Sequence, residues 1–299
     1  VQDDSDSTLK KRGTKEVVAG LPRRWASRLA ATACALGVMA SLCHAFSDQD
    51  VEQAIRKAAD YLWSQQQPNG SWGPFRMGDS AYPLGPTALA SYALLESGVS
   101  PQDARMVRAL EFLAKGDTEK TYTLGLRCNV WLAAARKDKR FLQFLRKDVD
   151  RLVTSTAKGG YNYDCHADGQ SGRWYSDNSN SQYGLLGVWA GARSGLPIPQ
   201  EYWVKATWHW MGCQRGDGGW AYNEDGPSTR TMAAAGVASL FVCYDNLLSS
   251  ATGFLRCRVG PKETAAHLPI ERGLQWFDRE FEKTLSSSAW RYYYLYGLE

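Results

Sequence analysis

Carboxylate side chains gather in two polar stretches of the sequence, each of which lies before an apolar run. One stretch contains Asp164 and Asp177, and the other contains Glu224 and Asp225. Two carboxylates in different surroundings can act as general acid and general base, which is the chemistry of glycan hydrolysis or elimination. These four residues are therefore the candidate catalytic residues.

Helix capping is the structural alternative for part of this region. Asp177, Asn178, Ser179 and Ser228 all lie just before apolar runs of helical length. A side-chain oxygen at such a place would accept hydrogen bonds from the free backbone amides of a helix N-terminus. Both interpretations are open at the level of the sequence.

Aromatic and amide side chains flank the same carboxylates and are candidates for ligand binding. They are Trp174, Tyr175, Gln182, Trp220 and Tyr222. Aromatic faces beside amides and carboxylates suit a sugar ring, whereas an aromatic wall alone suits an apolar or amphipathic small molecule. The sequence predicts a ligand of one of these two classes and does not separate them.

The triplet Asp164-Cys165-His166 contains three residue types that bind metals. Adjacent side chains of an extended segment point to opposite sides, so ligation of one ion by all three is disfavoured. No metal site is predicted, and the sequence does not identify a cofactor.

A repeated frame of glutamine, glycine and an aromatic residue lies along the chain. QQPNGSW at 66–72 and QRGDGGW at 214–220 share the spacing Gln-x-x-x-Gly-x-Trp, and STAKGGY at 155–161 and TLSSSAW at 284–290 are relaxed copies. We expect the glycine to adopt a positive φ that ends a helix, the aromatic residue to cover the junction, and the glutamine amide to reach carbonyls at a helix end. The frame is therefore predicted to be mainly scaffold.

Two kinds of helix are expected around each frame. The helix before it is amphipathic, and in four cases it carries a basic residue followed by a small one. These pairs are Lys57-Ala58, Arg108-Ala109, Lys205-Ala206 and Arg272-Gly273. The helix after the frame is almost uncharged and rich in Ala, Gly and Leu, so it must be surrounded by protein. Its small residues would let neighbouring helices approach closely.

Hairpins of such helices must stack, because one hairpin cannot bury its own apolar faces. About five hairpins occupy residues 46–299. The pattern predicts an all-α fold, an α/α toroid in which the amphipathic helices form the outer ring. The N-termini of the inner helices then face one end, where both carboxylate stretches would border one cavity mouth. Because the sequence stops within an expected inner helix, we expect an incomplete ring and either a protein partner or a missing C-terminal continuation.

Residues 1–45 are predicted to be a leader with an export signal. Arg23, Arg24 and Arg28 precede an uncharged run at 29–43, and the small residue Ala45 follows. This order predicts a periplasmic or extracellular protein, and retention of the signal as a membrane anchor is the alternative. The leader also carries most of the formal charge of +4. No basic face remains to indicate nucleic-acid binding.

The two strict frames and their Lys-Ala pairs resemble the QW repeats of the terpenoid cyclase and protein prenyltransferase superfamily over roughly residues 50–299. The C-terminal WRYYYLYGLE is similar to exported bacterial proteins described as prenyltransferase/squalene-oxidase repeat proteins. The resemblance implies the toroid, but the chain lacks the Asp-x-Asp-Asp run of squalene-hopene cyclases. It also lacks the Asp-x-Cys motif of prenyltransferases and the thioester motif of complement-like toroids.

These absences favour a ligand-binding or partner-binding protein over an enzyme of those classes. A glycan-active lyase or hydrolase that uses the loop carboxylates is the first alternative. A divergent squalene or terpene cyclase with an altered acid is the second.

Overall fold

The computed structural model describes residues 47–77, 80–156, 158–166, 176–250, 267–286 and 290–298. The predicted leader and export signal, and the candidate ligand residues Trp174 and Tyr175, lie outside these ranges. Residues 57–299 form one compact unit, and residues 1–56 form another.

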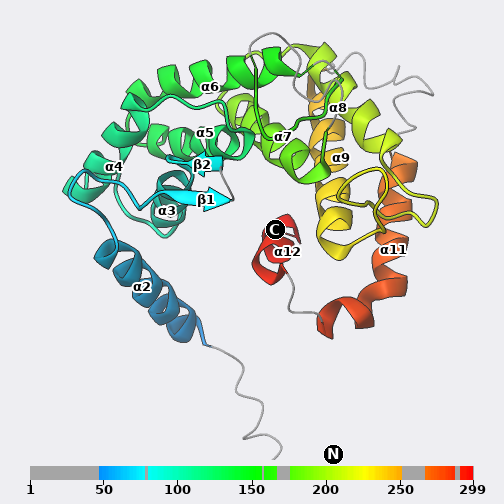
Figure 1. The fold of residues 1–299 in the computed structure, drawn as a ribbon, viewed down its shortest axis with the longest axis horizontal. Helices are drawn as coiled ribbons and strands as arrows, with labels where there is room; N and C mark the ends of the chain where they lie inside the picture. The colour runs from blue at the N-terminus through cyan, green and yellow to red at the C-terminus, as the bar shows by residue number, and fades with distance from the viewer. Residues whose placement is uncertain are drawn as a thin grey trace, which may run out of the picture. The chain divides into compact units, whose positions relative to one another are not determined.

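The described secondary structure is almost entirely helical (Figure 1). The helices are α2 (Asp48–Ser64), α3 (Gly85–Glu96), α4 (Ala104–Lys115), α5 (Thr121–Ala135), the 3-10 turn η1 (Lys139–Phe141), α6 (Leu142–Ser155), α7 (Asn178–Arg193), α8 (Gln200–Gly212), α9 (Arg230–Ser250), α11 (His267–Ser286) and α12 (Arg291–Leu298). The hairpin of β1 (Phe75–Met77) and β2 (Ser80–Tyr82) was not expected from the sequence. It pairs Phe75 with Tyr82 in antiparallel register and leads into α3.

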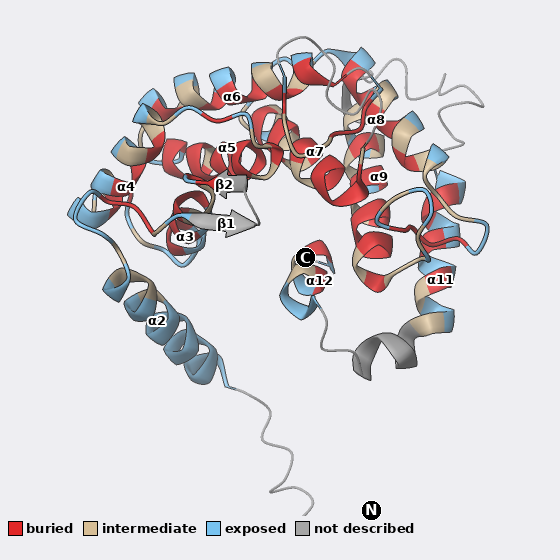
Figure 2. Ribbon diagram, viewed as in Figure 1, coloured by how far each residue is buried: buried red, intermediate tan, exposed pale blue. Residues whose placement is uncertain are grey.

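Helices of residues 57–299 form two layers. In the inner layer α3 packs on α5, α5 on α7 and α7 on α9, while α4, α6, α8 and α11 cover them from outside. Figure 2 shows the inner helices buried almost throughout and the outer helices buried along one side. This arrangement confirms the predicted all-α fold of the α/α toroid type.

Glycines bring the inner helices into close contact, as expected. A Cβ atom on Gly187 of α7 would lie 2.9 Å from Cα of Gly125 in α5, and a Cβ atom on Gly125 would overlap the backbone of Tyr183. Because any side chain would separate these backbones, the two helices can pack this tightly only through glycine.

The strict frames fold as predicted around their glycine and tryptophan. Gly218 has φ +93°, and the indole nitrogen of Trp220 donates to the carbonyl of Trp210 in α8 at 2.8 Å. In the first frame Gly70 has φ +88°, and the Trp72 indole donates to the carbonyl of Leu62. The turn and its aromatic cover are thus built in the same way twice.

The frame glutamine was expected to reach carbonyls at a helix end. Its amide does reach a helix end, in the first turn of the next outer helix: Gln214 donates to the carbonyl of Gly218 at 2.9 Å and to that of Pro269, in the first turn of α11, at 2.7 Å. Gln66 repeats both bonds, with Gly70 and with Arg105 of α4. The glutamine therefore ties its turn to the next outer helix.

The basic-small pairs have a role that was not evident from the sequence. A Cβ atom on Gly70 would lie 2.5 Å from the carbonyl carbon of Arg108, and one on Gly218 would lie 2.7 Å from the carbonyl oxygen of Arg272. Gly159, with φ +86°, meets the backbone of Lys205 in the same way. Each of these three frame glycines is thus docked on the basic residue of the next outer helix.

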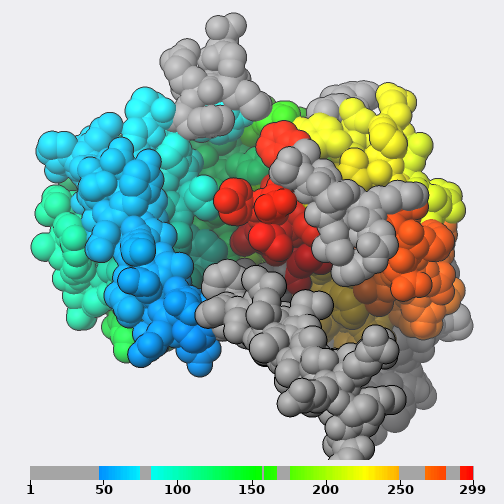
Figure 3. Space-filling model, turned by 90° about the horizontal axis from the view of Figure 1, so that it is seen from below, coloured from blue at the N-terminus to red at the C-terminus, as the bar shows by residue number. Residues whose placement is uncertain are grey.

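The fourth frame copy, TLSSSAW, was wrongly assigned. Trp290 has φ +54°, and its side chain is 78% exposed, so it covers no hairpin junction. The expected last inner helix does form as α12, which packs against α9. Part of α12 is visible in red at the surface in Figure 3.

A buried ion pair fixes α5 to α6. The guanidinium of Arg127 donates to both carboxylate oxygens of Asp148, at 2.7 and 2.5 Å, and the Trp131 indole donates to the same carboxylate at 2.8 Å. The guanidinium also donates to the carbonyl of Gly116, just after α4, at 2.8 Å. The charged side chains are 4% and 3% exposed. Every buried polar atom of this ion pair thus has a hydrogen-bond partner.

One described helix is long and apolar enough to cross a membrane, the stretch Arg230–Leu248 of α9. In the structure this helix packs against α7, α8, α11 and α12. It has the surroundings of a core helix.

His209 of α8 is partly buried where the relaxed frame at 155–161 docks. A Cβ atom on Gly160 would lie 2.6 Å from the imidazole, and the Trp210 ring meets it edge-on. Burial lowers the pKa of His209 to about 4, whereas an unfolded histidine titrates near ~6.5. Between these values the unfolded chain binds a proton that the folded chain does not.

We expect this histidine to make stability depend on pH. The contribution is fully present above the unfolded pKa and is lost as pH falls toward the folded one, by about 2 kcal/mol between pH 7.5 and 5. Urea unfolding measured at both pH values should show that His209→Gln loses less unfolding free energy between pH 7.5 and 5 than the unmodified chain does. The exposed His267→Gln is the control and should lose as much as the unmodified chain. Equal losses for both variants would show that His209 titrates normally.

Candidate functional site

The two carboxylate stretches meet at the N-terminal end of α7, as predicted. The backbone amide of Asn178 donates to the carbonyl of Tyr222 at 3.0 Å, and its side-chain amide donates to the carbonyl of Ala221 at 2.8 Å. The phenol oxygens of Tyr163 and Tyr222 are 2.7 Å apart. Both loops therefore border one end of the inner layer.

Asp177 caps α7. Its carboxylate accepts hydrogen bonds from the Asn180 amide at 2.8 Å, the Asn180 side chain at 2.7 Å and the Ser179 hydroxyl at 2.5 Å, and its side chain is fully buried. The capping interpretation is confirmed for Asp177 only. Asn178 and Ser179 lie inside α7 and do not precede it. At the start of α9 the capping residue is Thr229 rather than Ser228, because the Thr229 hydroxyl accepts a hydrogen bond from the backbone amide of Met232.

Asp164 is held in an ion pair. Its carboxylate lies 2.7 Å from the ammonium of Lys120, at an antiparallel bridge between the two residues. Next to it, the buried Cys165 thiol lies 3.1 Å from the Thr121 hydroxyl, whereas His166 is exposed. Adjacent side chains of the triplet thus point apart, as its extended backbone predicts.

Glu224 and Asp225 are exposed in the turn after Tyr222. The acidic residue with many partners in this region is Asp217, inside the second strict frame at 214–220, and the sequence did not single it out. It accepts hydrogen bonds from the Gly219 amide at 3.0 Å, the Ser228 hydroxyl at 2.8 Å and the Trp276 indole at 3.1 Å. Burial acts to raise the pKa of Asp217, but these hydrogen bonds outweigh it and hold that pKa below its ordinary value.

Trp220 was wrongly placed among the ligand-binding residues. Its side chain is fully buried, and its ring fills the space that Cβ atoms on Gly236 of α9 and Gly273 of α11 would occupy. The ring belongs to the scaffold and is not accessible to a ligand. Gln182 is buried on α7, and Tyr222 is partly exposed at the loop.

Four phenols converge at this end of α7, and we refer to them as the tyrosine cluster. They are Tyr122 of α5, Tyr163, Tyr222 and Tyr293 of α12. The Tyr293 hydroxyl donates to the side-chain oxygen of Gln182 at 2.6 Å, and the phenols of Tyr163 and Tyr222 hydrogen bond to each other. Polar side chains from three helices and two loops thus gather at this end of α7.

Aromatic faces continue this cluster along the inner side of α7. The ring of Tyr183 lies 4.2 Å from that of Tyr122, 6.1 Å from that of Tyr293 and 5.8 Å from that of Tyr296, measured between centroids. Burial raises the pKa of Tyr122 and of Tyr293, so these phenols remain protonated donors at neutral pH. Sequence reasoning did not single out Tyr293 within the aromatic run at 290–297.

Residues 22–134 match the family model of the squalene-hopene cyclase N-terminal domain. The match begins inside the predicted leader and extends to α5, so it includes the first strict frame. It supports membership of the terpenoid cyclase and protein prenyltransferase superfamily, and it agrees with the helical fold. A search of curated proteins found no match.

Proposed function

We propose that this chain is a ligand-binding protein with a cyclase-like fold, and that it takes an apolar or amphipathic small molecule at the tyrosine cluster. The convergence of the four phenols on the N-terminal end of α7 is the observation that carries this proposal. Protonated phenols offer directional hydrogen bonds, while the faces of Tyr183 and Tyr296 offer apolar contact. A molecule with one oxygen function and a hydrocarbon body satisfies both.

The surroundings of the carboxylates favour binding over acid-base catalysis. Asp177 uses both oxygens to cap α7, and Asp164 is paired with Lys120. Glu224 is exposed to solvent in the turn after Tyr222. A glycan-active enzyme or a divergent cyclase would need a carboxylate in a more enclosed position.

Titration with farnesol, an isoprenoid alcohol, tests the proposal. Tyr222→Phe and Tyr293→Phe each remove a hydroxyl, and we expect each to weaken farnesol binding about 5- to 10-fold, the effect of one lost hydrogen bond. Tyr292→Phe is the control because this neighbour on α12 is 85% exposed. It should bind like the unmodified chain.

Four outcomes would contradict the proposal. Equal affinities in all variants would separate farnesol from the cluster, and absence of binding would remove the ligand class. Binding of cellohexaose in place of farnesol would support the glycan alternative. Conversion of squalene to a cyclic product would support the cyclase alternative.

A further inference from the structure

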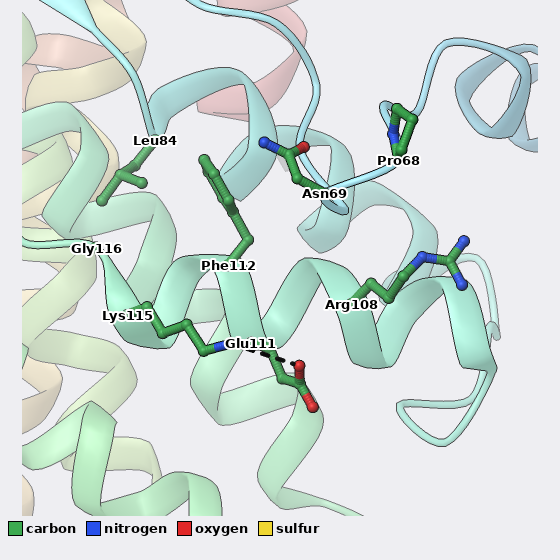
Figure 4. Close-up of a pocket in the computed structure, with 8 residues that line it drawn as sticks. All are labelled: Pro68, Asn69, Leu84, Arg108, Glu111, Phe112, Lys115 and Gly116. Carbon is green, nitrogen blue, oxygen red and sulfur yellow. Dashed lines mark ion pairs between the residues drawn. The ribbon is translucent and has the colours of Figure 1, made fainter.

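A cavity of about 470 Å³ lies on the outer side of the first strict frame, away from the tyrosine cluster. Its lining residues come from the turn at 68–69, from α4 and from the segment before α3. They are Pro68, Asn69, Leu84, Arg108, Glu111, Phe112, Lys115 and Gly116 (Figure 4). The volume is within the usual range for small-molecule sites.

The corresponding place in the second strict frame, at 214–220, can be identified from the docking of the turns. Gly70 docks on Arg108 and Gly218 docks on Arg272. Counting from these two arginines along their helices, Phe112 corresponds to Trp276 and Lys115 corresponds to Arg279. Within the aligned turns, Asn69 corresponds to Asp217 and Ser71 to Gly219.

The chain itself closes this place in the second strict frame. The Trp276 indole donates to the second carboxylate oxygen of Asp217 at 3.1 Å, and the guanidinium of Arg279 donates to the backbone carbonyl of Asp217. The indole lies against Gly219, where a Cβ atom would be 2.8 Å from its nitrogen. The donor ring of Trp276, the acceptor carboxylate of Asp217 and the glycine at 219 thus pack against one another.

The first frame lacks each of these three parts. Phe112 has no donor, and Ser71 carries a side chain where Gly219 has none. Lys115 lies 3.8 Å from the carboxylate of Glu111, a loose surface pair. Together with Asn69 in place of Asp217, these differences leave the space open.

Asn69 presents a hydrogen-bond donor to the cavity, where Asp217 in the other strict frame presents an acceptor. Its side-chain oxygen accepts from the amide of Ser71 at 3.0 Å and from the Ser71 hydroxyl at 2.8 Å, as the first oxygen of Asp217 does with its own partners. The free end of the side chain is therefore an amide donor instead of a carboxylate acceptor. Figure 4 shows this nitrogen turned toward Phe112.

We infer that this cavity binds a small molecule with an aromatic or aliphatic body and one anionic oxygen group, such as a carboxylate or sulfonate. The buried Leu84 and the half-buried Phe112 form an apolar floor for the body. The amide of Asn69 and the ammonium of Lys115 donate to the anionic group, and Arg108 adds positive charge at the rim. The ligand thereby supplies what the Trp276 ring and the Asp217 carboxylate supply in the second strict frame.

The fluorescent probe 8-anilinonaphthalene-1-sulfonate has both features and tests the inference by titration. Asn69→Asp keeps the bonds to Ser71 and places a carboxylate against the sulfonate, so we expect at least tenfold weaker binding. Lys115→Gln removes the facing charge and should weaken binding severalfold. Gln102→Glu and Lys137→Gln make the same charge changes at exposed positions outside the lining, and they should bind as the unmodified chain does.

Two results of these titrations would overturn the inference. Affinities of Asn69→Asp and Lys115→Gln equal to those of their controls would place the probe elsewhere on the chain. An unmodified chain that does not bind the probe would exclude this ligand class. Because the tyrosine cluster is untouched by these variants, farnesol binding should stay unchanged, which separates this inference from the proposed function.

Discussion

Asp148→Ala is expected to lower the free energy of unfolding by about 3–5 kcal/mol, the usual cost of removing one partner of a buried ion pair. The substitution leaves the guanidinium of Arg127 buried without a counter-charge, and the Trp131 indole without its acceptor. Since Arg127 also bonds the carbonyl after α4, the loss affects three helices. Urea unfolding monitored by circular dichroism measures the change.

A matched control lies two residues further along α6. Asp150 is exposed, and its side chain makes no described ion pair, so Asp150→Ala should change stability by less than about 0.5 kcal/mol. Replacing both buried partners, by Arg127→Met with Asp148→Leu, should recover much of the lost stability because no buried charge remains. If Asp148→Ala and Asp150→Ala unfolded at the same urea concentration, the pair would not stabilise the fold.

Gly159→Ala is expected to be the most destabilising of the glycine substitutions in the turns, by about 3 kcal/mol. Positive φ disfavours alanine by about 1–2 kcal/mol. In addition, the new methyl group would overlap the carbonyl of Lys205 and lie 2.6 Å from the amide of Ala206, which adds an overpacking cost of about 1–3 kcal/mol. The docked turn would have to move away from α8.

Gly195→Ala separates the two costs. This glycine has nearly the same φ, +87°, but a Cβ atom there would have open space around it. We therefore expect Gly195→Ala to cost only the conformational part, about 1–2 kcal/mol. Equal losses for the two variants in thermal or urea unfolding would mean that the docking contact does not constrain the turn.

The fold could be predicted from the sequence because its signals are local. An uncharged helix rich in small residues can only be an inner helix, and the glycine of each strict frame has the positive φ that its position indicates. Docking was not predictable, since Gly218 and Arg272 meet only after two intervening segments have folded. The pair Arg127 and Asp148 was missed for the same reason, although a lone arginine in an apolar helix was a usable signal.

The candidate site was predictable only in its location. Capping residues precede inner helices, so both loops had to meet at one end of the inner layer. Which side chains face one another there depends on packing, which is why Trp220 was misplaced and Tyr293 was overlooked. Asp217 could have been noticed, because an acidic residue between two glycines is well placed to bind free amides in a tight turn.

The docking of each glycine turn on the following outer helix gives the chain a direction during synthesis. A turn such as 214–220 leaves the ribosome before α11. The side-chain amide of Gln214 can therefore form its hydrogen bond with the Pro269 carbonyl only after that residue has been synthesised. Each newly made hairpin thus completes the one before it, and maturation of the nascent chain should advance from the N-terminus toward the C-terminus one hairpin at a time.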